Sequence, residues 1–264
     1  MMAAMSLPGF TETQFSHDGV ARVVYRRGAG PGVVVMHEIP GITPSVAAFA
    51  ERVADAGFTV FVPHLFGTPG KLDTPLYIAE QLARACISRE FHVLASRQAS
   101  PITDWLRALC RDVHAELGGK GVGAIGMCLT GNFALALMVD PAIAAPVLSQ
   151  PSLPFPLSRE RRAGLHLSDD DLRAVKERVA AGTPVLGLRF THDPMCPKER
   201  FDRLGAELGD GFERIEIDSS PGNPHGLTRT AHSVLTRDLV DREGHPTREA
   251  LSRVLAFFRE RLHP

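Results

Sequence analysis

The sequence has almost no net charge, no apolar run long enough to cross a membrane and no signal for secretion. Its 264 residues include 29 Lys and Arg against 30 Asp and Glu, which gives a formal net charge of −1. This balance argues against nucleic acid or another polyanion as a partner, although a local basic patch at Arg159, Arg161 and Arg162 stays open. The N-terminus lacks a basic segment followed by an apolar one, and no later stretch could span a bilayer. We therefore expect a soluble, cytoplasmic protein that binds neither nucleic acid nor membrane.

Cysteines are few and scattered, which excludes a disulfide framework and the paired C-x-x-C spacing of many metal sites. The four positions are Cys86, Cys110, Cys128 and Cys196. Cys86 and Cys110 fall on apolar faces of predicted helices, so we interpret them as packing residues. The His-Glu pair at positions 37 and 38 does not continue into H-E-x-x-H, and no other cluster has metal-ligand spacing. The sequence predicts no metal site.

Short β-branched runs alternate with longer amphipathic stretches along the chain. This alternation is typical of βα units that feed a mainly parallel sheet flanked by helices. The expected strands are Val20–Arg26, Gly32–Met36, Thr59–Pro63, Val122–Met127, Ile143–Leu148, Val185–Phe190 and Phe212–Ile217. The expected helices lie near Pro44–Ala56, Pro75–Ile87, Ile102–Leu117, Leu129–Val139, Ser168–Ala181, Pro197–Leu208 and Thr247–Leu262. With 44% hydrophobic residues the chain can bury one full core, so we expect a single α/β domain over residues 1–264.

Three segments depart from the alternation. Residues 1–17 are expected to be an N-terminal extension. Residues 151–168 begin rich in proline and basic residues and are expected to be an irregular excursion, and residues 64–73 form a second irregular region. Loops at the carboxyl ends of strands form the ligand site in open α/β sheets, so both irregular regions are candidates for its walls.

Cys128 stands between a short apolar strand and an apolar helix, within Gly126-Met-Cys-Leu-Thr-Gly131. In G-x-S-x-G hydrolases the nucleophile sits on such a sharp strand-to-helix turn, where small flanking residues let the backbone approach closely. The start of the following helix would favour a thiolate and stabilise an oxyanion. The alternative interpretation is a buried cysteine at a tightly packed turn.

A cysteine nucleophile needs a base, and the base needs a group that orients it. Asp193 follows the strand expected over Val185–Phe190, and the loop 219–236 after the next strand carries His225 and His232. The order nucleophile, acid, histidine is that of the α/β-hydrolase fold. Spacing does not choose between the two histidines, and Asp193 could instead cap the helix that follows it.

Glu38 comes at the carboxyl end of the strand Gly32–Met36, just before the Pro40-Gly41 turn. In this fold an acid there would face the nucleophile, and the turn is the region that donates a second oxyanion-hole N–H. The alternative is a salt-bridged residue at the rim of the site.

Together these segments resemble the dienelactone hydrolase family of α/β-hydrolases, from about Asp18 to Leu262. His37-Glu-Ile-Pro-Gly41 is similar to the family's Q-E-I-F-G strand end, and Gly126–Gly131 is similar to its G-Y-C-L-G-G elbow. His192-Asp193 resembles the family's acid loop. Ala231-His-Ser-Val-Leu-Thr236 resembles its G-H-S-F-A-R loop, which favours His232 over His225.

The resemblance implies hydrolysis of an ester or enol-lactone through an acyl-cysteine, without a cofactor. The implied site residues are Cys128 as nucleophile, His232 as its base, Asp193 as the orienting acid, Glu38 in contact with the thiol to govern when the thiolate forms, and the backbone N–H groups of Leu129 and Ile39 as the oxyanion hole. The implied partner is a small-molecule ester or lactone, and the resemblance does not choose between a monomer and a homodimer.

Three positions depart from the family's pattern. Thr130 stands where the family has glycine, His37 replaces its glutamine, and Thr236 replaces an arginine, with Arg237 one position later. Arginine can hold a carboxylate bidentately and threonine cannot, so another ester or lactone is expected as readily as dienelactone. Two alternatives stay open: a thioesterase or acyltransferase of the same fold, and a non-catalytic scaffold.

Overall fold

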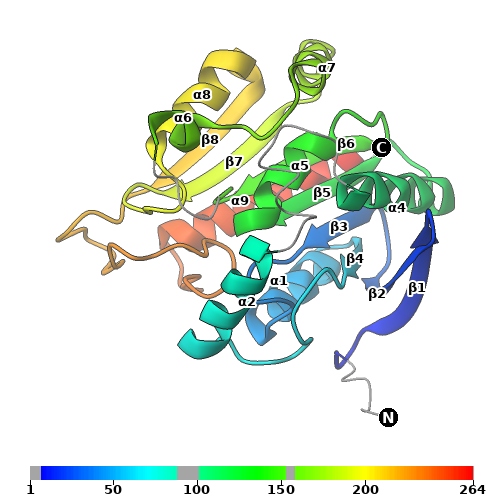
Figure 1. The fold of residues 1–264 in the computed structure, drawn as a ribbon, viewed down its shortest axis with the longest axis horizontal. Helices are drawn as coiled ribbons and strands as arrows, with labels where there is room; N and C mark the ends of the chain where they lie inside the picture. Colours follow the sequence, from blue (N-terminus) through cyan, green and yellow to red (C-terminus); the bar gives the residue numbers. More distant parts are fainter. Residues whose placement is uncertain (1–6, 88–100, 153–157, 264) are drawn as a thin grey trace.

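Eight strands form one sheet in the order β1-β2-β4-β3-β5-β6-β7-β8 in the computed structural model, which describes residues 7–87, 101–152 and 158–263 (Figure 1). The strands are β1 (Thr11–His17), β2 (Val20–Gly28), β3 (Gly32–Met36), β4 (Thr59–Pro63), β5 (Val122–Met127), β6 (Ile143–Ser149), β7 (Val185–Phe190) and β8 (Phe212–Ile217). Strands β1, β2 and β4 pair antiparallel, and every pair from β4 to β8 is parallel. The predicted fold, a mainly parallel sheet in an α/β domain, is confirmed.

The sequence prediction is wrong for strand β1. Residues 11–17 pair with β2 as an edge strand, so they are not an extension outside the sheet. Asp18 and Gly19, both with positive φ, form the two-residue turn that joins the strands. Most side chains of β1 are exposed, and its polar composition therefore hid the strand from a search for apolar runs.

Helices cover both faces of the sheet. They are α1 (Pro44–Asp55), α2 (Pro75–Ile87), α4 (Pro101–Leu117), α5 (Gly131–Leu137), α6 (Arg159–Ala163), α7 (Asp169–Ala180), α8 (Lys198–Leu208) and α9 (Pro246–Leu262). Helix α6 lies inside residues 151–168, so this excursion is less irregular than expected. The helix expected from Leu129 begins instead as a 3₁₀ turn, Cys128–Thr130, followed by α5.

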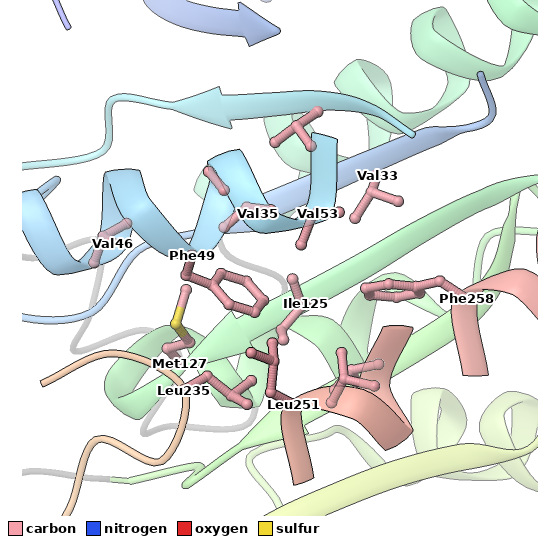
Figure 2. Packing of buried hydrophobic residues seen from close by; sticks show 14 of the residues in the cluster. Val33, Val35, Val46, Phe49, Val53, Ile125, Met127, Leu235, Leu251 and Phe258 are labelled. Carbon is pink, nitrogen blue, oxygen red and sulfur yellow. The ribbon is translucent and has the colours of Figure 1, made fainter. Parts of the chain in front are cut away.

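Alternate residues of the central strands point into two separate hydrophobic cores. Val33 and Val35 of β3 face α1 and α9, while Val34 and Met36 face α4 and α5. Figure 2 shows the first core, where Phe49 of α1 lies over Ile125 of β5. Because β3, β5 and β6 are buried on both faces, they can hold the loops at their carboxyl ends in fixed positions.

Parallel pairing brings the carboxyl ends of β3, β5, β6, β7 and β8 to one edge of the sheet. The segment after β8, orange in Figure 1, lies at this edge before the chain enters α9. Glu38, Cys128, Gln150, Asp193 and His232 all follow one of these strands. In the part of the chain that the structure describes, no helix is long and apolar enough to span a membrane.

Candidate active site

Cys128 directly follows β5 in a left-handed backbone conformation, with φ +56°. This conformation is strained for a residue with a side chain, at a cost of about 1–2 kcal/mol. A Cβ at Gly126 would lie 2.0 Å from the carbonyl oxygen of Thr130, and one at Gly131 would lie 2.8 Å from Cα of Pro151. The two glycines therefore permit the sharp turn that the sequence predicts around Cys128.

Thr130 ties this turn to the end of β3. Its hydroxyl accepts a hydrogen bond from the backbone N–H of Met127 at 2.9 Å. The same oxygen lies 2.9 Å from the carbonyl oxygen of Met36 and 3.1 Å from that of His37. The residue that replaces the family's glycine thus adds a cross-link between two strand ends.

Asp193 and His232 form a direct pair. Nδ1 of His232 lies 2.6 Å from Oδ2 of Asp193, whose side chain is fully buried. The other carboxylate oxygen of Asp193 accepts the backbone N–H of Met195 at 2.9 Å. His225 instead stacks edge-on against His245, with ring centroids 5.5 Å apart. The structure therefore brings His232, and not His225, to the acid.

The other nitrogen of His232 faces the sulfur of Cys128. Nε2 is buried and makes no hydrogen bond of regular geometry within the described residues. Cys128 is nevertheless close enough to influence the ring through its charge and as a hydrogen-bonding side chain. Burial alone would lower the pKa of His232. Charge interactions and hydrogen bonds with Cys128 and Asp193 outweigh burial and raise the pKa of His232 well above its usual value. The raised pKa favours the protonated form of His232 at this position.

Glu38 is buried, and three neutral side chains hold its carboxylate. Ser233 donates to Oε2 at 2.8 Å, Gln150 donates to the same oxygen at 3.2 Å, and Thr236 donates to Oε1. Within the described residues its hydrogen bonds go to these three groups and none goes to Cys128. The predicted contact with the thiol is therefore not a hydrogen bond here, and Glu38 is also not a salt-bridged rim residue.

The predicted oxyanion-hole residues, Leu129 and Ile39, pack together with Cys128. Ile39 packs against a small buried cluster formed by Cys128 and Leu129, and Met195 lies against the same cluster. The turn after β3 closes with a hydrogen bond from the N–H of Gly41 to the carbonyl oxygen of Glu38 at 2.8 Å. The two backbone segments proposed to donate to an oxyanion thus meet at Cys128.

The model of the dienelactone hydrolase family matches residues 20–262. The chain belongs to this family. A relative from Saccharomyces cerevisiae, named "Putative carboxymethylenebutenolidase", is 25% identical over 190 residues, which are 70% of this chain and 66% of the relative. The chain thus spans slightly less than two thirds of that relative's length.

Solved structures share the fold of this dienelactone hydrolase family member. A protein from Klebsiella pneumoniae subsp. pneumoniae, named "Putative Dienelactone Hydrolase", aligns with TM-score 0.63 and 19% identity, and the alignment covers 95% of this chain and 98% of that one. A metagenomic dienelactone hydrolase-like promiscuous phosphotriesterase aligns with TM-score 0.57 and 17% identity, covering 94% and 96%. At these identities the likeness concerns the fold alone.

His37, where the family has glutamine, is buried, and its ring links the loop after β3 to the loop after β4. Its Nε2 accepts the backbone N–H of Leu65 at 3.1 Å, and Nδ1 lies 3.2 Å from the carbonyl oxygen of Glu38. Nδ1 therefore carries the proton of a neutral ring. Burial, in the first place, lowers the pKa of His37 to about 3.

Two other thiols in the described part of the chain lie in apolar surroundings. Cys110 is fully buried in α4, as expected of a packing residue, and burial raises its pKa. Burial also raises the pKa of Cys196 to about 12. Both thiols stay protonated near neutral pH. The side chain of Cys86 lies outside the described residues, as does that of Arg159 in the suggested basic patch.

Gln150, Ser233 and Thr236 are site residues that sequence reasoning did not assign. Gln150 directly follows β6, a position at the same sheet edge as Cys128, and this was the available signal. Thr236 drew notice only as a departure from arginine. Among the described residues, no group of three or more His, Cys, Asp and Glu side chains is arranged to hold a metal ion.

Proposed function

We propose that this chain hydrolyses a carboxylic ester or lactone, with Cys128 as nucleophile, His232 as acid and base, and Asp193 as the orienting acid. The observation that carries the proposal is the pairing of His232 Nδ1 with Asp193 at 2.6 Å while Nε2 faces a cysteine on a strained strand-to-helix turn. This is the arrangement by which a base accepts the proton of a nucleophile and is itself held in one orientation.

In the proposed reaction the thiolate sulfur of Cys128 attacks the carbonyl carbon, and the carbonyl electron pair moves onto oxygen. The tetrahedral intermediate collapses, the bond to the leaving alkoxide breaks, and the alkoxide takes the proton from Nε2 of His232. Neutral His232 then takes a proton from water, whose oxygen attacks the acyl-cysteine. Collapse of the second intermediate releases the carboxylic acid and restores the thiolate.

The backbone N–H groups of Leu129 and Ile39 are the proposed donors to the oxyanion. Leu129 lies in the first turn after the nucleophile, where the N–H groups of a helix start lack partners within the helix. Ile39 lies against Cys128 from the loop after β3. Removing one such donor typically slows the chemical step by about 10²–10³.

Contacts of Thr236 favour a substrate without a free carboxylate. Its hydroxyl donates to Glu38, and Arg237 lies 3.7 Å from Asp238. Neither residue reproduces the arginine clamp expected of a dienelactone carboxylate site, and the buried carboxylate of Glu38 would repel a second one nearby. We propose a neutral ester or lactone as the substrate.

The structure favours neither alternative that the sequence left open. Acyl carrier recognition rested on basic residues in the 151–168 excursion, but Arg162 there is paired with Glu199 through two hydrogen bonds of 2.9 and 3.1 Å. A non-catalytic scaffold gives no reason for a strained cysteine to stand opposite a histidine whose pKa is raised.

The test is hydrolysis of p-nitrophenyl acetate, simple lactones, dienelactone and acyl thioesters by the natural protein and by Cys128→Ala and Cys128→Ser. Cys110→Ala, which removes a buried thiol in α4, is the matched control. We expect turnover of neutral esters or lactones that both Cys128 variants lose by at least about 10³-fold and the control keeps. Full activity in folded Cys128→Ala would contradict the proposed nucleophile.

A further inference from the structure

Gln150 bridges several strand ends with one fully buried side chain. Its Nε2 donates to Oε2 of Glu38 at 3.2 Å, and its Oε1 accepts the backbone N–H of Val234 at 3.4 Å. Ser149 donates to the same Oε1. The amide of Gln150 therefore links the loop after β3 to the histidine loop, two residues from His232.

The backbone around Gln150 reaches the nucleophile. The N–H of Gln150 donates to the carbonyl oxygen of Leu188 in β7 at 2.7 Å, and its own carbonyl oxygen accepts the hydroxyl of Ser152 at 2.8 Å. The N–H of Ser152 in turn donates to the carbonyl oxygen of Cys128 at 2.9 Å. Gln150 is thus connected to Glu38, Cys128 and the histidine loop at once.

Gln150 also holds a strained conformation, with φ +33°. For a residue with a side chain this region costs of order 1–3 kcal/mol, and it persists only where surrounding contacts maintain it. Glycine would adopt this conformation without the penalty, but glycine has no side-chain amide. The strain therefore accompanies a specific use of the side chain.

We propose that Gln150 is a positioning residue, which orients Glu38 and the histidine loop around Cys128 by keeping one amide donor on Glu38 and one amide acceptor on the loop. The inference rests on the proposed function, because it concerns the same site. Titratable and charged groups around Gln150 in the described chain come from four elements. They are Glu38 after β3, Cys128 after β5, His232 and Asp238 in the loop that holds Val234, and Arg200 of α8, which donates to the carbonyl oxygen of Pro151 at 2.6 Å. Of these, only Glu38 shares a hydrogen bond with its side chain.

Gln150→Glu tests the proposal with almost no change of shape. The new carboxyl keeps an oxygen for the N–H of Val234 but places a second acid about where the amide donated to Glu38. Two carboxyl groups so close share one proton, and the protonated pair can imitate the amide hydrogen bond. When that proton leaves as the pH rises, the two carboxylates repel each other.

At acidic pH we expect kcat/KM of Gln150→Glu to approach that of the natural protein. As the pH rises, the variant's kcat/KM should drop to about a tenth to a hundredth of the natural value, because this is the rate effect of losing one charge-assisted hydrogen bond. Gln14→Glu on the exposed edge strand makes the same chemical change away from the site and should leave the profile unchanged. Gln150→Leu, which removes donor and acceptor together, should lose activity at every pH.

The alkylation rate of Cys128 by iodoacetamide, read by peptide mass against pH, supplies a measurement independent of turnover. As the pH rises, the alkylation rate of Cys128 in Gln150→Glu should fall increasingly below the rate in the natural protein, as kcat/KM does. A folded Gln150→Glu variant whose activity and alkylation profiles run parallel to those of the natural protein would overturn the positioning role. If the natural protein itself shows no turnover that depends on Cys128, the proposed function fails, while the alkylation profiles still decide the role of Gln150.

Discussion

Replacement of His37 by glutamine should change how the stability of the protein depends on pH. The neutral ring accepts the N–H of Leu65 at Nε2. In a protonated ring Nε2 would itself carry a proton, and this proton would point at the N–H of Leu65. The pKa of His37 is lowered to about 3 in the folded protein, against about 6.5 in an unfolded chain. Below pH 6.5 the unfolded chain therefore binds a proton that the folded protein refuses, and stability falls with falling pH.

The magnitude follows from the difference between the two pKa values. At pH 7 the histidine is mostly neutral in both states, and the effect is close to zero. At pH 5, about 1.5 units below the pKa of this histidine in the unfolded chain, proton binding stabilises the unfolded chain by about 2 kcal/mol. His37→Gln has no such group, so it loses none of this free energy on acidification.

Urea unfolding followed by the fluorescence of Trp105, which is the single tryptophan and is buried, measures both proteins at pH 7 and pH 5. Losses caused by carboxylates elsewhere act on both proteins and cancel in the comparison. The difference in unfolding free energy between the natural protein and His37→Gln should shift by about 2 kcal/mol in favour of the variant at pH 5. An unchanged difference between the two pH values would refute the buried, neutral state of His37.

Three further substitutions test the geometry around the nucleophile. Asp193→Asn removes the carboxylate that helps to raise the pKa of His232, so kcat/KM should fall by about a hundredfold or more and alkylation of Cys128 at neutral pH should slow; an unaltered alkylation profile would contradict this coupling. Thr130→Val leaves the N–H of Met127 without its hydroxyl partner and should lower the unfolding free energy in urea by about 1–3 kcal/mol, whereas Thr130→Ser should retain most of it. Gly126→Ala places a methyl group 2.0 Å from the carbonyl oxygen of Thr130, so we expect about 1–3 kcal/mol of destabilisation together with slower ester turnover, and normal values of both would speak against the tight turn.

The central strands and the covering helices were predictable because they are apolar and periodic. Strands such as β5, buried along their whole length, leave a continuous apolar run in the sequence. Strand β1 has no such run, because an edge strand exposes most of its side chains. The Asp18-Gly19 turn was its one clear signal, and an apolar search gave that pair no weight.

The meeting of Asp193 with the histidine loop was also within reach, since both follow strands whose carboxyl ends meet at one edge of the sheet. Spacing did not choose between His225 and His232, and the family resemblance favoured His232. The contacts of Glu38 were not within reach. Its carboxylate is held by Gln150, Ser233 and Thr236, which come from two other loops. Which hydroxyl or amide reaches a buried acid depends on side-chain positions that strand periodicity does not determine.

Trapping of the acyl group tests the central claim most directly. The natural protein is mixed with a p-nitrophenyl ester, quenched in acid within the first turnovers, digested and analysed by peptide mass. We expect to find the acyl mass on the peptide that contains Cys128. Ester turnover at the natural rate with acyl groups on another residue, or with none on Cys128 at any quench time, would contradict an acyl-cysteine at this position.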